Sequence, residues 1–512
     1  MGGINQKYAL VSVFDKTGVA DFAKELVSLG YKIISTGGTA KLLTENKISV
    51  IPIQEITGNP ESFDGRMKTI SFEIESGILF DRTNSSHVKQ AKELKIKPID
   101  IVACNLYPFE QTLTIENIDV GGPTMLRAAG KNFKNVLSVC STSDYSIIIN
   151  ALKNKKINDS FRRELAAKTF AHLSFYDSQI AKYLSFGKFT EELTIAGRKI
   201  QDLRYGENPH QKASFYTEAN SKSPLSRIKR LWGRELSLVN LTDINAGLES
   251  VKQFSEPAAV VIKHNSPSGI ALGKDPKEAL ERAIQADPES AFGGVIVLNK
   301  NVDKKTAAVI AQFKDERRGN IDILAAPYTD KNALEFLKKI RKSMGIYIFG
   351  RITKPGKKDV NIKWVNQGFI IQNADISSDN DYKRWKVVTK KKPSAKQNSQ
   401  MKIAWKFISR IRSNSIIVVD KNLPLTRGIG SGQTSRVRST KIALEQAGKH
   451  TKGAVLASDS FFPFDDSVKL AAKHGISAII QQGGSINDNL SIQAADKAGI
   501  AMVFTSRRTF WH

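Results

Sequence analysis

The fold of the first part of the chain is decided by the segment Tyr8–Ile53, which reads YALVSVFDKTGVADFAKELVSLGYKIISTGGTAKLLTENKISVIPI. It alternates apolar stretches of strand length with stretches whose apolar residues recur every three or four positions, as in Val19, Phe22 and Leu26. Gly30 ends the first of these helical stretches. This β-α-β-α-β order predicts an α/β fold built on a parallel sheet.

The same pattern continues to about Gly197, where we place a domain boundary. IDIVACNLY (99–107) and NVLSVC (135–140) are candidates for buried strands, and Phe161–Tyr183 has helical periodicity. We therefore expect a first domain at residues 1–197.

Residues 198–512 again alternate apolar strands with helices, so this part is also α/β. This part has more residues than one hydrophobic core usually holds, which favours two packed subdomains. We place the seam between them at roughly residues 365–395. A Lys-rich stretch, Lys383–Lys396 (KRWKVVTKKKPSAK), lies near this seam.

Composition narrows the class of protein. The chain has 512 residues, 41% hydrophobic and 25% charged, and no apolar run approaches the roughly 20 residues that span a bilayer. The N-terminus lacks the pattern of a secretory signal, so we expect a cytoplasmic protein without membrane contact. Its two cysteines, Cys104 and Cys140, lie in apolar runs and predict buried thiols rather than disulfides or a zinc site.

The net charge of +27 would by itself favour a polyanionic partner. Outside Lys383–Lys396, however, the basic residues are scattered among helices that also carry Asp and Glu. A solvated basic surface is therefore favoured over a groove for nucleic acid.

In the first half, two glycine pairs each open a predicted helix. STGGTAK (35–41) and DVGGP (119–123) can present free backbone amides to a phosphate, although such turns are as often purely structural. Lys131 ends the helix that follows the second turn, and Lys68 and Tyr107 complete a candidate site for a phosphate and a polar ring.

In the second half, VVIKHNSPSG (260–269) places Lys263 and His264 at the end of a buried strand, before a predicted Ser-Pro turn. Open α/β sheets bind ligands at such strand ends. A histidine here can accept a proton near neutral pH, and an adjoining ammonium can stabilise an oxyanion. Alone, the dipeptide is more often a capped loop with a solvent-facing lysine.

Neighbouring motifs favour a catalytic role for Lys263 and His264 over a capped loop. LRYGENPHQ (203–211) concentrates Arg204, Tyr205 and His210 in one loop without an obvious core purpose. SAFGG (290–294), GQTSR (432–436) and SDSFFPF (458–464) add Gly-rich backbone, an arginine and aromatic side chains.

Together with SVFDKTG, GRMKT, NLYPF, LRAAGKN, WKVVTK, SNSIIV, GGSI and TSRRTFWH, these motifs occur in the order of one family. The chain resembles the bifunctional phosphoribosylaminoimidazolecarboxamide formyltransferase / IMP cyclohydrolases along its whole length. The resemblance implies a cyclohydrolase domain similar to methylglyoxal synthase at residues 1–197. It implies a formyltransferase of two cytidine-deaminase-like subdomains at residues 198–512.

For formyl transfer from 10-formyltetrahydrofolate to 5-aminoimidazole-4-carboxamide ribonucleotide (AICAR), the resemblance implies His264 as the proton acceptor. Lys263 and Asn414 would stabilise the oxyanion and orient the formyl group. The implied nucleotide ligands are Arg204, Tyr205, His210, Asn240, Arg436 and Arg508. The implied folate contacts are Asp322, Phe461 and Phe462.

For ring closure to inosine monophosphate (IMP), the matching catalytic residues are Lys68, Tyr107, Asp119 and Lys131. The implied substrate contacts are Ser12, Lys16, Ser35, Gly37, Gly38, Thr39 and Asn105. The family implies no metal, small-molecule nucleotide and folate substrates, and a homodimer.

Two alternatives stay open at this point. Ser71, Phe72 and Glu75 stand where the family usually has His, Pro and His, so one alternative is a formyltransferase with an impaired cyclohydrolase domain. The other is a basic RNA-binding protein on a retired enzyme scaffold, with Lys383–Lys396 as the contact.

Overall fold

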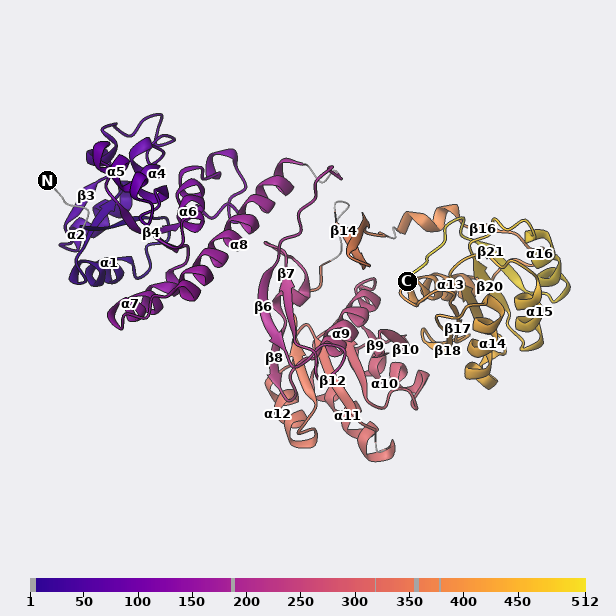
Figure 1. The fold of residues 1–512 in the computed structure, drawn as a ribbon. Coiled ribbons are helices and arrows are strands. Elements are labelled where there is room, and N and C mark those ends of the chain that lie inside the picture. Colours follow the sequence, from indigo (N-terminus) through magenta and orange to yellow (C-terminus); the bar gives the residue numbers. More distant parts are fainter. Residues whose placement is uncertain (1–5, 186–188, 318, 354–358, 377–378) are drawn as a thin grey trace. The chain divides into compact units, whose positions relative to one another are not determined.

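The computed structural model describes residues 6–185, 189–317, 319–353, 359–376 and 379–512. The chain forms two compact units. The first is Met1–Arg198 with Thr217–Asn220, and the second is Lys199–Tyr216 with Ser221–His512. Figure 1 draws most of the first unit in indigo to purple and the second in magenta to yellow.

The first unit is built on a five-stranded sheet in the order β3-β2-β1-β4-β5, with every pairing parallel. The predicted parallel sheet is confirmed. Leu10 and Ile34 face one apolar core, and their neighbours Val11 and Ile33 face another. Both faces are buried, which explains continuous apolar runs rather than alternation. The strands are β1 (Lys7–Val13), β2 (Tyr31–Ser35), β3 (Val50–Pro52), β4 (Ile99–Asn105) and β5 (Leu137–Val139).

Helices cover both faces of this sheet (Figure 1). The longest, α8, has 26 residues and contributes Leu173 and Tyr176 to the core that contains Leu10. The helices are α1 (Val19–Ser28), α2 (Gly37–Glu45), α3 (Gln54–Thr57), α4 (Phe72–Leu79), α5 (Ser85–Glu93), η1 (Ile115–Asn117), α6 (Gly121–Lys131), η2 (Thr142–Asp144), α7 (Tyr145–Lys153) and α8 (Asp159–Leu184).

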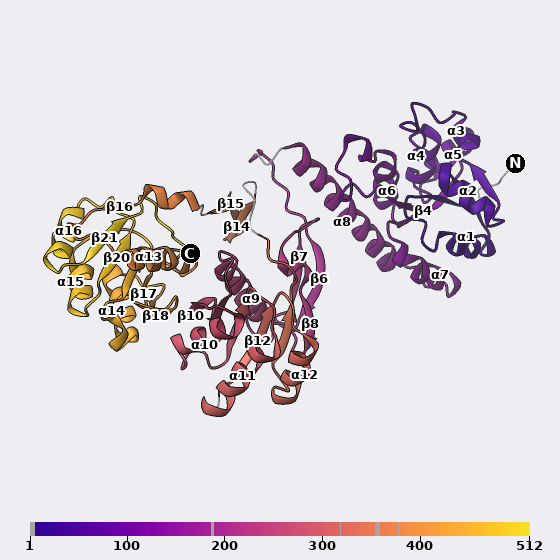
Figure 2. The same ribbon diagram turned by 180° about the vertical axis from the view of Figure 1, so that it is seen from behind.

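The second unit contains two six-stranded sheets, seen from the other side in Figure 2. The strands of the first sheet are β10 (Ser266–Leu272), β9 (Ala258–Lys263), β11 (Gly294–Leu298), β12 (Ile321–Ala326), β13 (Gly345–Ile348) and β8 (Lys229–Trp232), in spatial order. Those of the second are β18 (Thr426–Gly430), β17 (Ile416–Val419), β19 (Val455–Ser458), β20 (Ala478–Gln481), β21 (Ala501–Phe504) and β16 (Lys386–Val387).

The two sheets repeat one topology. Along each, two antiparallel pairings are followed by two parallel pairings and a final antiparallel one. The helices also correspond in order. In the first sheet they are α9 (Leu238–Val251), α10 (Pro276–Ala286), α11 (Lys304–Arg317) and α12 (Lys331–Ile340). In the second they are α13 (Ala395–Ile408), α14 (Arg436–Ala447), α15 (Asp466–Lys473) and α16 (Asp488–Lys497). This repetition confirms the expected pair of α/β subdomains.

The remaining elements are short. Two further two-stranded sheets pair β6 (Arg198–Leu203) with β7 (Ala213–Thr217) and β14 (Val360–Val365) with β15 (Gly368–Asn373). The short helices are η3 (Pro224–Arg227), η4 (Asp379–Arg384) and η5 (Gly448–Thr451). The Lys-rich stretch Lys383–Lys396 contains β16, an edge strand of the second sheet, where lysines discourage pairing with other chains.

One prediction about local structure is wrong. Ser266 and Pro267 do not form a turn, because they begin β10. The turn is the pair His264–Asn265, whose φ values of 53° and 59° are those of a two-residue hairpin turn. Pro267 is tolerated because β10 is an edge strand and needs no hydrogen bond on one side.

The two subdomains meet at their hairpin edges. Ala271 of β10 forms an antiparallel bridge with Leu425. The backbone N–H of Ile270 donates to Thr426 Oγ1 at 3.1 Å, and that of Leu272 donates to Pro424 O at 2.9 Å. One apolar core contains residues of both sheets, so residues beyond about 220 fold as one unit.

The close packing of β18 on α14 gives a stability prediction. A Cβ at Gly428 would lie 1.9 Å from the backbone oxygen of Ala443, so the helix must move. We expect Gly428→Ala to lower the free energy of unfolding by about 2 kcal/mol or more in a urea titration. Gly368→Ala is the control, because its nearest neighbour would be 4.0 Å away. Equal unfolding midpoints for the two variants would contradict the prediction.

Candidate active sites

In the first unit, two lysines lie over the glycine turn that opens α2. A Cβ at Gly37 would lie 2.6 Å from Lys68 Nζ, and one at Gly38 would lie 3.7 Å from Lys16 Cε. Gly37 also has a φ of 41°, which favours glycine. The turn therefore combines the positive end of a helix with two ammonium groups, of which that of Lys68 also pairs with Glu61 at 3.1 Å. This is an arrangement for a phosphate.

Three of the predicted substrate contacts hold this turn in place. Ser35 Oγ donates to Val11 O at 2.6 Å, and Ser12 Oγ lies 2.9 Å from Thr36 Oγ1. Thr39 Oγ1 accepts from the N–H of Val13 at 3.1 Å and donates to its oxygen at 3.0 Å. These hydroxyl groups link the turn to β1, and their contact with a phosphate stays a prediction.

Asn105, at the end of β4, supports the loop that carries Lys16. Its Oδ1 accepts from the N–H groups of Phe14 and Asp15 at 2.7 and 2.8 Å. Its Nδ2 donates to Asp15 O at 2.9 Å. All the polar atoms of this side chain thus hold the loop after β1.

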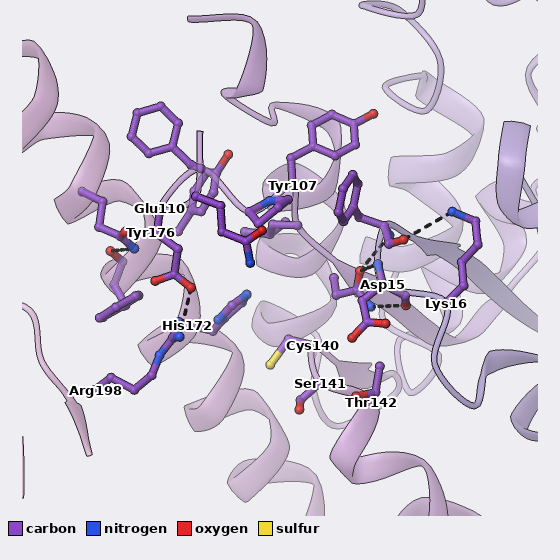
Figure 3. Close-up of a pocket in the computed structure, with 18 residues that line it drawn as sticks. Asp15, Lys16, Tyr107, Glu110, Cys140, Ser141, Thr142, His172, Tyr176 and Arg198 are labelled. Carbon is purple, nitrogen blue, oxygen red and sulfur yellow. Dashed lines mark hydrogen bonds and ion pairs between the residues drawn. The ribbon is translucent and has the colours of Figure 1, made fainter. Parts of the chain in front are cut away.

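A cavity of about 700 Å³ opens beside this loop, at the carboxyl ends of the parallel strands β1, β4 and β5 (Figure 3). Lys16, Asn105 and Tyr107 line it, together with residues of α8. The carboxyl edge of a parallel sheet is where α/β folds bind ligands, so this position suits a substrate.

Asp119 begins the second glycine turn, close to Tyr107. Its Oδ1 accepts from the N–H of Gly122 at 2.9 Å, and its own N–H donates to Tyr176 Oη at 2.7 Å. Burial raises the pKa of the Asp119 carboxyl, while backbone hydrogen bonds from Gly122 and Tyr107 act in the opposite direction. Lys131 lies at the other end of α6, about 15 Å along the helix axis. The structure therefore does not bring Lys131 to Asp119 within this chain.

The residues that depart from the family's pattern begin a helix. Ser71 caps α4 by accepting the N–H of Ile74 at 3.2 Å, and Phe72 is 61% exposed. Burial raises the pKa of Glu75, one turn later. Ser71 is therefore the N-cap of α4, and Phe72 and Glu75 lie in its first turn.

In the second unit, Lys263 and His264 lie at the hairpin turn of β9 and β10. Lys263 Nζ donates to Phe292 O at 2.6 Å, just before β11. The N–H of Asn265 donates to Asp243 Oδ1 at 2.7 Å. Burial raises the pKa of Asp243, and its hydrogen bond to Asn265 and the charge of His264 oppose this. The turn is thus held from both sides.

The residues predicted to bind the nucleotide differ in exposure. Arg204 is exposed, stacks at 4.6 Å on the ring of Tyr205 and donates to its hydroxyl at 2.8 Å. His210 is exposed in the same loop. Asn240 is only 8% exposed, and its side chain closes a capping box with Ser237 at the start of α9.

Asn414 precedes β17 and contacts Arg436. Arg436 Nη2 donates to Asn414 Oδ1 at 2.7 Å, and Asn414 Nδ2 donates to Gln433 O at 3.0 Å. Arg508 is exposed and stacks on Phe510 at 4.7 Å.

The residues predicted to contact folate differ in how much of each side chain is exposed. Phe462 is completely buried in an apolar core, whereas Phe461 is 36% exposed. Of the two phenylalanines predicted to contact folate, only Phe461 is exposed enough to do so. Asp322 forms an ion pair with Arg234 at 2.7 Å and accepts from Asn320 at 3.2 Å.

Comparison with known proteins decides the family. A family model described as "AICARFT/IMPCHase bienzyme" matches residues 129–446, and one described as "MGS-like domain" matches residues 18–124. The bifunctional purine biosynthesis protein PurH of Thermoanaerobacter sp. (strain X514) is 44% identical over 519 residues. That alignment covers 99% of this chain and 100% of that protein.

The chain belongs to the AICARFT/IMPCHase bienzyme family. PurH of Bacillus cereus (strain AH820) is also 44% identical, over 521 residues, with 99% of this chain and 100% of that protein covered. A solved structure described as "Crystal structure of ForH" is 30% identical. It covers 35% of this chain and 97% of its own, at a TM-score of 0.33.

Family membership confirms the predicted pair of activities, AICAR formyl transfer and IMP ring closure. The family acts on small molecules and uses a folate co-substrate for the first step. Nothing in the family model or the relatives named above favours a formyltransferase that lacks the second activity. Among the described residues, no cluster of three His, Cys, Asp or Glu side chains could hold a metal ion. In the same part of the chain, no helix is both long and apolar enough to cross a membrane.

Sequence reasoning missed His172 and Arg198, which line the cavity opposite Lys16 (Figure 3). His172 Nε2 is buried without a hydrogen-bond partner, and Arg198 pairs with Glu110 at 3.0 Å. Burial and then the charge of Arg198 lower the pKa of His172. The available signal was spacing, because His172 lies four residues before Tyr176 and thus on the same face of α8. The two cysteines are buried and free, as predicted.

The lowered pKa of His172 predicts a pH dependence. Below about pH 6.5 the unfolded chain binds a proton on His172 more readily than the folded chain does. The free energy of unfolding therefore decreases as the pH is lowered. We expect His172→Gln to lose less stability than the wild type between about pH 7 and 5 in urea titrations. His87→Gln, at an exposed histidine of the same unit, should behave as the wild type. Identical pH slopes for His172→Gln and wild type would contradict this.

Proposed function

We propose that the first unit closes the IMP ring and that the second unit formylates AICAR. What supports this division is that the MGS-like model matches residues 18–124, all within the first unit. Lys263, His264 and Asn414, the residues implied for formyl transfer, all belong to the second unit. The formyltransferase would use residues of both repeated sheets, and the cyclohydrolase would use the cavity at the carboxyl edge of the parallel sheet.

The formyl donor that we propose is 10-formyltetrahydrofolate. The 5-amino nitrogen of AICAR attacks the formyl carbon and its proton passes to His264, while Lys263 and Asn414 donate to the developing oxyanion. The bond from this carbon to N10 then breaks, N10 takes up a proton, and tetrahydrofolate leaves. The observation that carries this proposal is the hairpin turn, which holds His264 beside the anchored Lys263.

The remaining residues of the second unit would bind the substrates. Arg204 and Arg508 suit the nucleotide phosphate, because each guanidinium is exposed and already held against an aromatic ring. Tyr205, His210 and Asn240 would contact the rest of the nucleotide, and Arg436, whose side chain is only 7% exposed, would act through Asn414. Phe461 and Asp322 would contact the folate.

For ring closure, Lys16, Lys68 and the Gly37 turn would bind the phosphate. The carboxamide nitrogen adds to the formyl carbon and water leaves, so the step needs positioning and proton transfer. Tyr107 and Asp119 would supply the proton transfer, since the raised pKa of Asp119 favours a group that can carry a proton. Lys131 would act here if a second chain supplies it.

Neither step needs a metal in this proposal, because hydrogen-bond donors and proton carriers suffice for both reactions. We also propose that the protein works in the cytoplasm as a homodimer. The resemblance to the family supports this, and the distance of Lys131 from Asp119 is consistent with a site completed by a second chain.

The first functional prediction concerns His264. Given AICAR and 10-formyltetrahydrofolate, the wild type should release tetrahydrofolate, and His264→Asn should reduce kcat by about 100-fold or more, since a general base contributes that much. Ring closure of the formylated intermediate should be unchanged. His474→Asn, in the same unit but outside this cluster, is the control. A wild type without turnover would refute the function, and an active His264→Asn would refute the residue's role.

The second functional prediction concerns Lys68. With the formylated intermediate as substrate, Lys68→Gln should reduce kcat/KM for IMP formation by about tenfold or more, because one charged phosphate contact is lost. Formyl transfer should be unchanged. Lys92→Gln, at an exposed lysine of α5, is the control. Normal IMP formation by Lys68→Gln would show that Lys68 does not bind the substrate.

A further inference from the structure

The amide of Asn414 is held with one definite orientation. Its Oδ1 accepts from Arg436 Nη2 at 2.7 Å, and its Nδ2 donates to Gln433 O at 3.0 Å. A guanidinium can only donate, so the oxygen of the amide must face Arg436. One N–H of Nδ2 is then left for a ligand, and a donor is what a developing oxyanion requires.

Arg436 is in turn held by Asp459. Its Nη1 donates to Asp459 Oδ1 and, at 2.9 Å, to Ser458 Oγ. The side chain of Arg436 is 7% exposed and that of Asp459 is wholly buried. A wholly buried carboxylate has no surface for a substrate, so any effect of Asp459 on catalysis passes through its neighbours.

The second oxygen of Asp459 binds the residue next to Asn414. Asp459 Oδ2 accepts both the N–H and the hydroxyl of Ser415 at 3.0 Å. One carboxylate therefore fixes the side chain of Asn414 through Arg436 and its backbone through Ser415. Removing the carboxylate would leave a buried guanidinium without its counter-charge, which forces local rearrangement.

The backbone of Asp459 joins two further segments of the site. Its oxygen accepts from the N–H of Thr509 at 2.9 Å, next to Arg508. Phe461 follows two residues later on the same loop. The segments that carry Asn414, Arg508 and Phe461 thus meet at one buried residue.

We propose that Asp459 is a positioning residue for formyl transfer, which orients the Asn414 amide through Arg436 and Ser415 so that its free N–H faces the formyl oxygen. This inference rests on the proposed role of Asn414. It concerns a residue that contacts no substrate and that lies outside the set implied by the family resemblance.

The test is Asp459→Asn, which keeps the shape but removes the charge and one acceptor. We expect kcat for formyl transfer to fall by about 10- to 100-fold, the loss that follows from a displaced donor, with KM for AICAR changed by less than about threefold. IMP formation from the formylated intermediate should be unchanged, since it belongs to the first unit. This second activity reports on the folded first unit, and an unchanged KM for AICAR reports on the folded second unit that contains Asp459.

Asp420→Asn is the matched control. Asp420 is also a buried carboxylate, pairs with Arg427 at 2.8 Å and follows the same strand β17 at its opposite end. It should change formyl transfer by less than about threefold, because its carboxylate binds Asn422, Leu423 and Arg427 and not Asn414, Arg436 or Ser415. If Asp420→Asn causes the same loss as Asp459→Asn, the effect is structural and the proposal is wrong.

A double-mutant cycle separates positioning from a general effect. If Asp459 acts through Asn414, adding Asp459→Asn to Asn414→Ala should reduce kcat by less than about twofold further. If the two losses multiply, the proposal is overturned. Should Asp459→Asn not fold, Ser415→Ala replaces it and is expected to lower kcat by about three- to tenfold, the effect of one lost hydrogen bond.

These outcomes are distinct from failure of the proposed function. A wild type that releases no tetrahydrofolate refutes formyl transfer itself. An active wild type together with a fully active Asp459→Asn, or a fully active Ser415→Ala in its place, refutes only the positioning role.

Discussion

The second unit depends on two edge strands that cover each other. An exposed edge leaves backbone groups unpaired, and here the N–H groups of Ile270 and Leu272 in β10 donate to the Thr426 hydroxyl at the start of β18 and to Pro424 O just before it. The same junction closes an apolar core shared by both sheets. The His264 turn opens β10, and Asn414 precedes the strand that pairs with β18. The junction therefore constrains the elements that carry both halves of the proposed formyltransferase site.

Many polar side chains at the candidate sites of both units form hydrogen bonds that hold neighbouring segments in place. Asn105 binds the loop that carries Lys16, Thr39 binds β1, and Asp459 binds Arg436. A loop at a strand end has few contacts of its own, so its position depends on such side chains. In the mechanisms proposed above, neither reaction uses a covalent nucleophile, and the rate of each therefore depends on how accurately donors and proton carriers are placed. For this reason, the residues that hold the catalytic side chains in place matter to the rate as much as those that face the substrate.

Most elements were predictable because their signals are local. Apolar runs marked β1, β2, β4 and the central strands of the second unit, and helical spacing marked α1 and α8. The order of strands and helices predicted the parallel sheet, since short connections leave few topologies. The motifs identified the family, which the comparisons confirm. Edge strands such as β10 and β16 were missed, because small or charged residues in them resemble loops.

Local pattern thus sufficed for the elements, the parallel sheet and the family. Packing between distant segments decided the rest. Phe461 and Phe462 are equivalent in sequence, yet only the first reaches the surface, because the second fills a core closed by other helices. Arg436 is bound by Asp459, and His172 faces a cavity formed by the ends of three strands. Such contacts join residues far apart in the chain, and no local periodicity encodes which way a polar side chain turns.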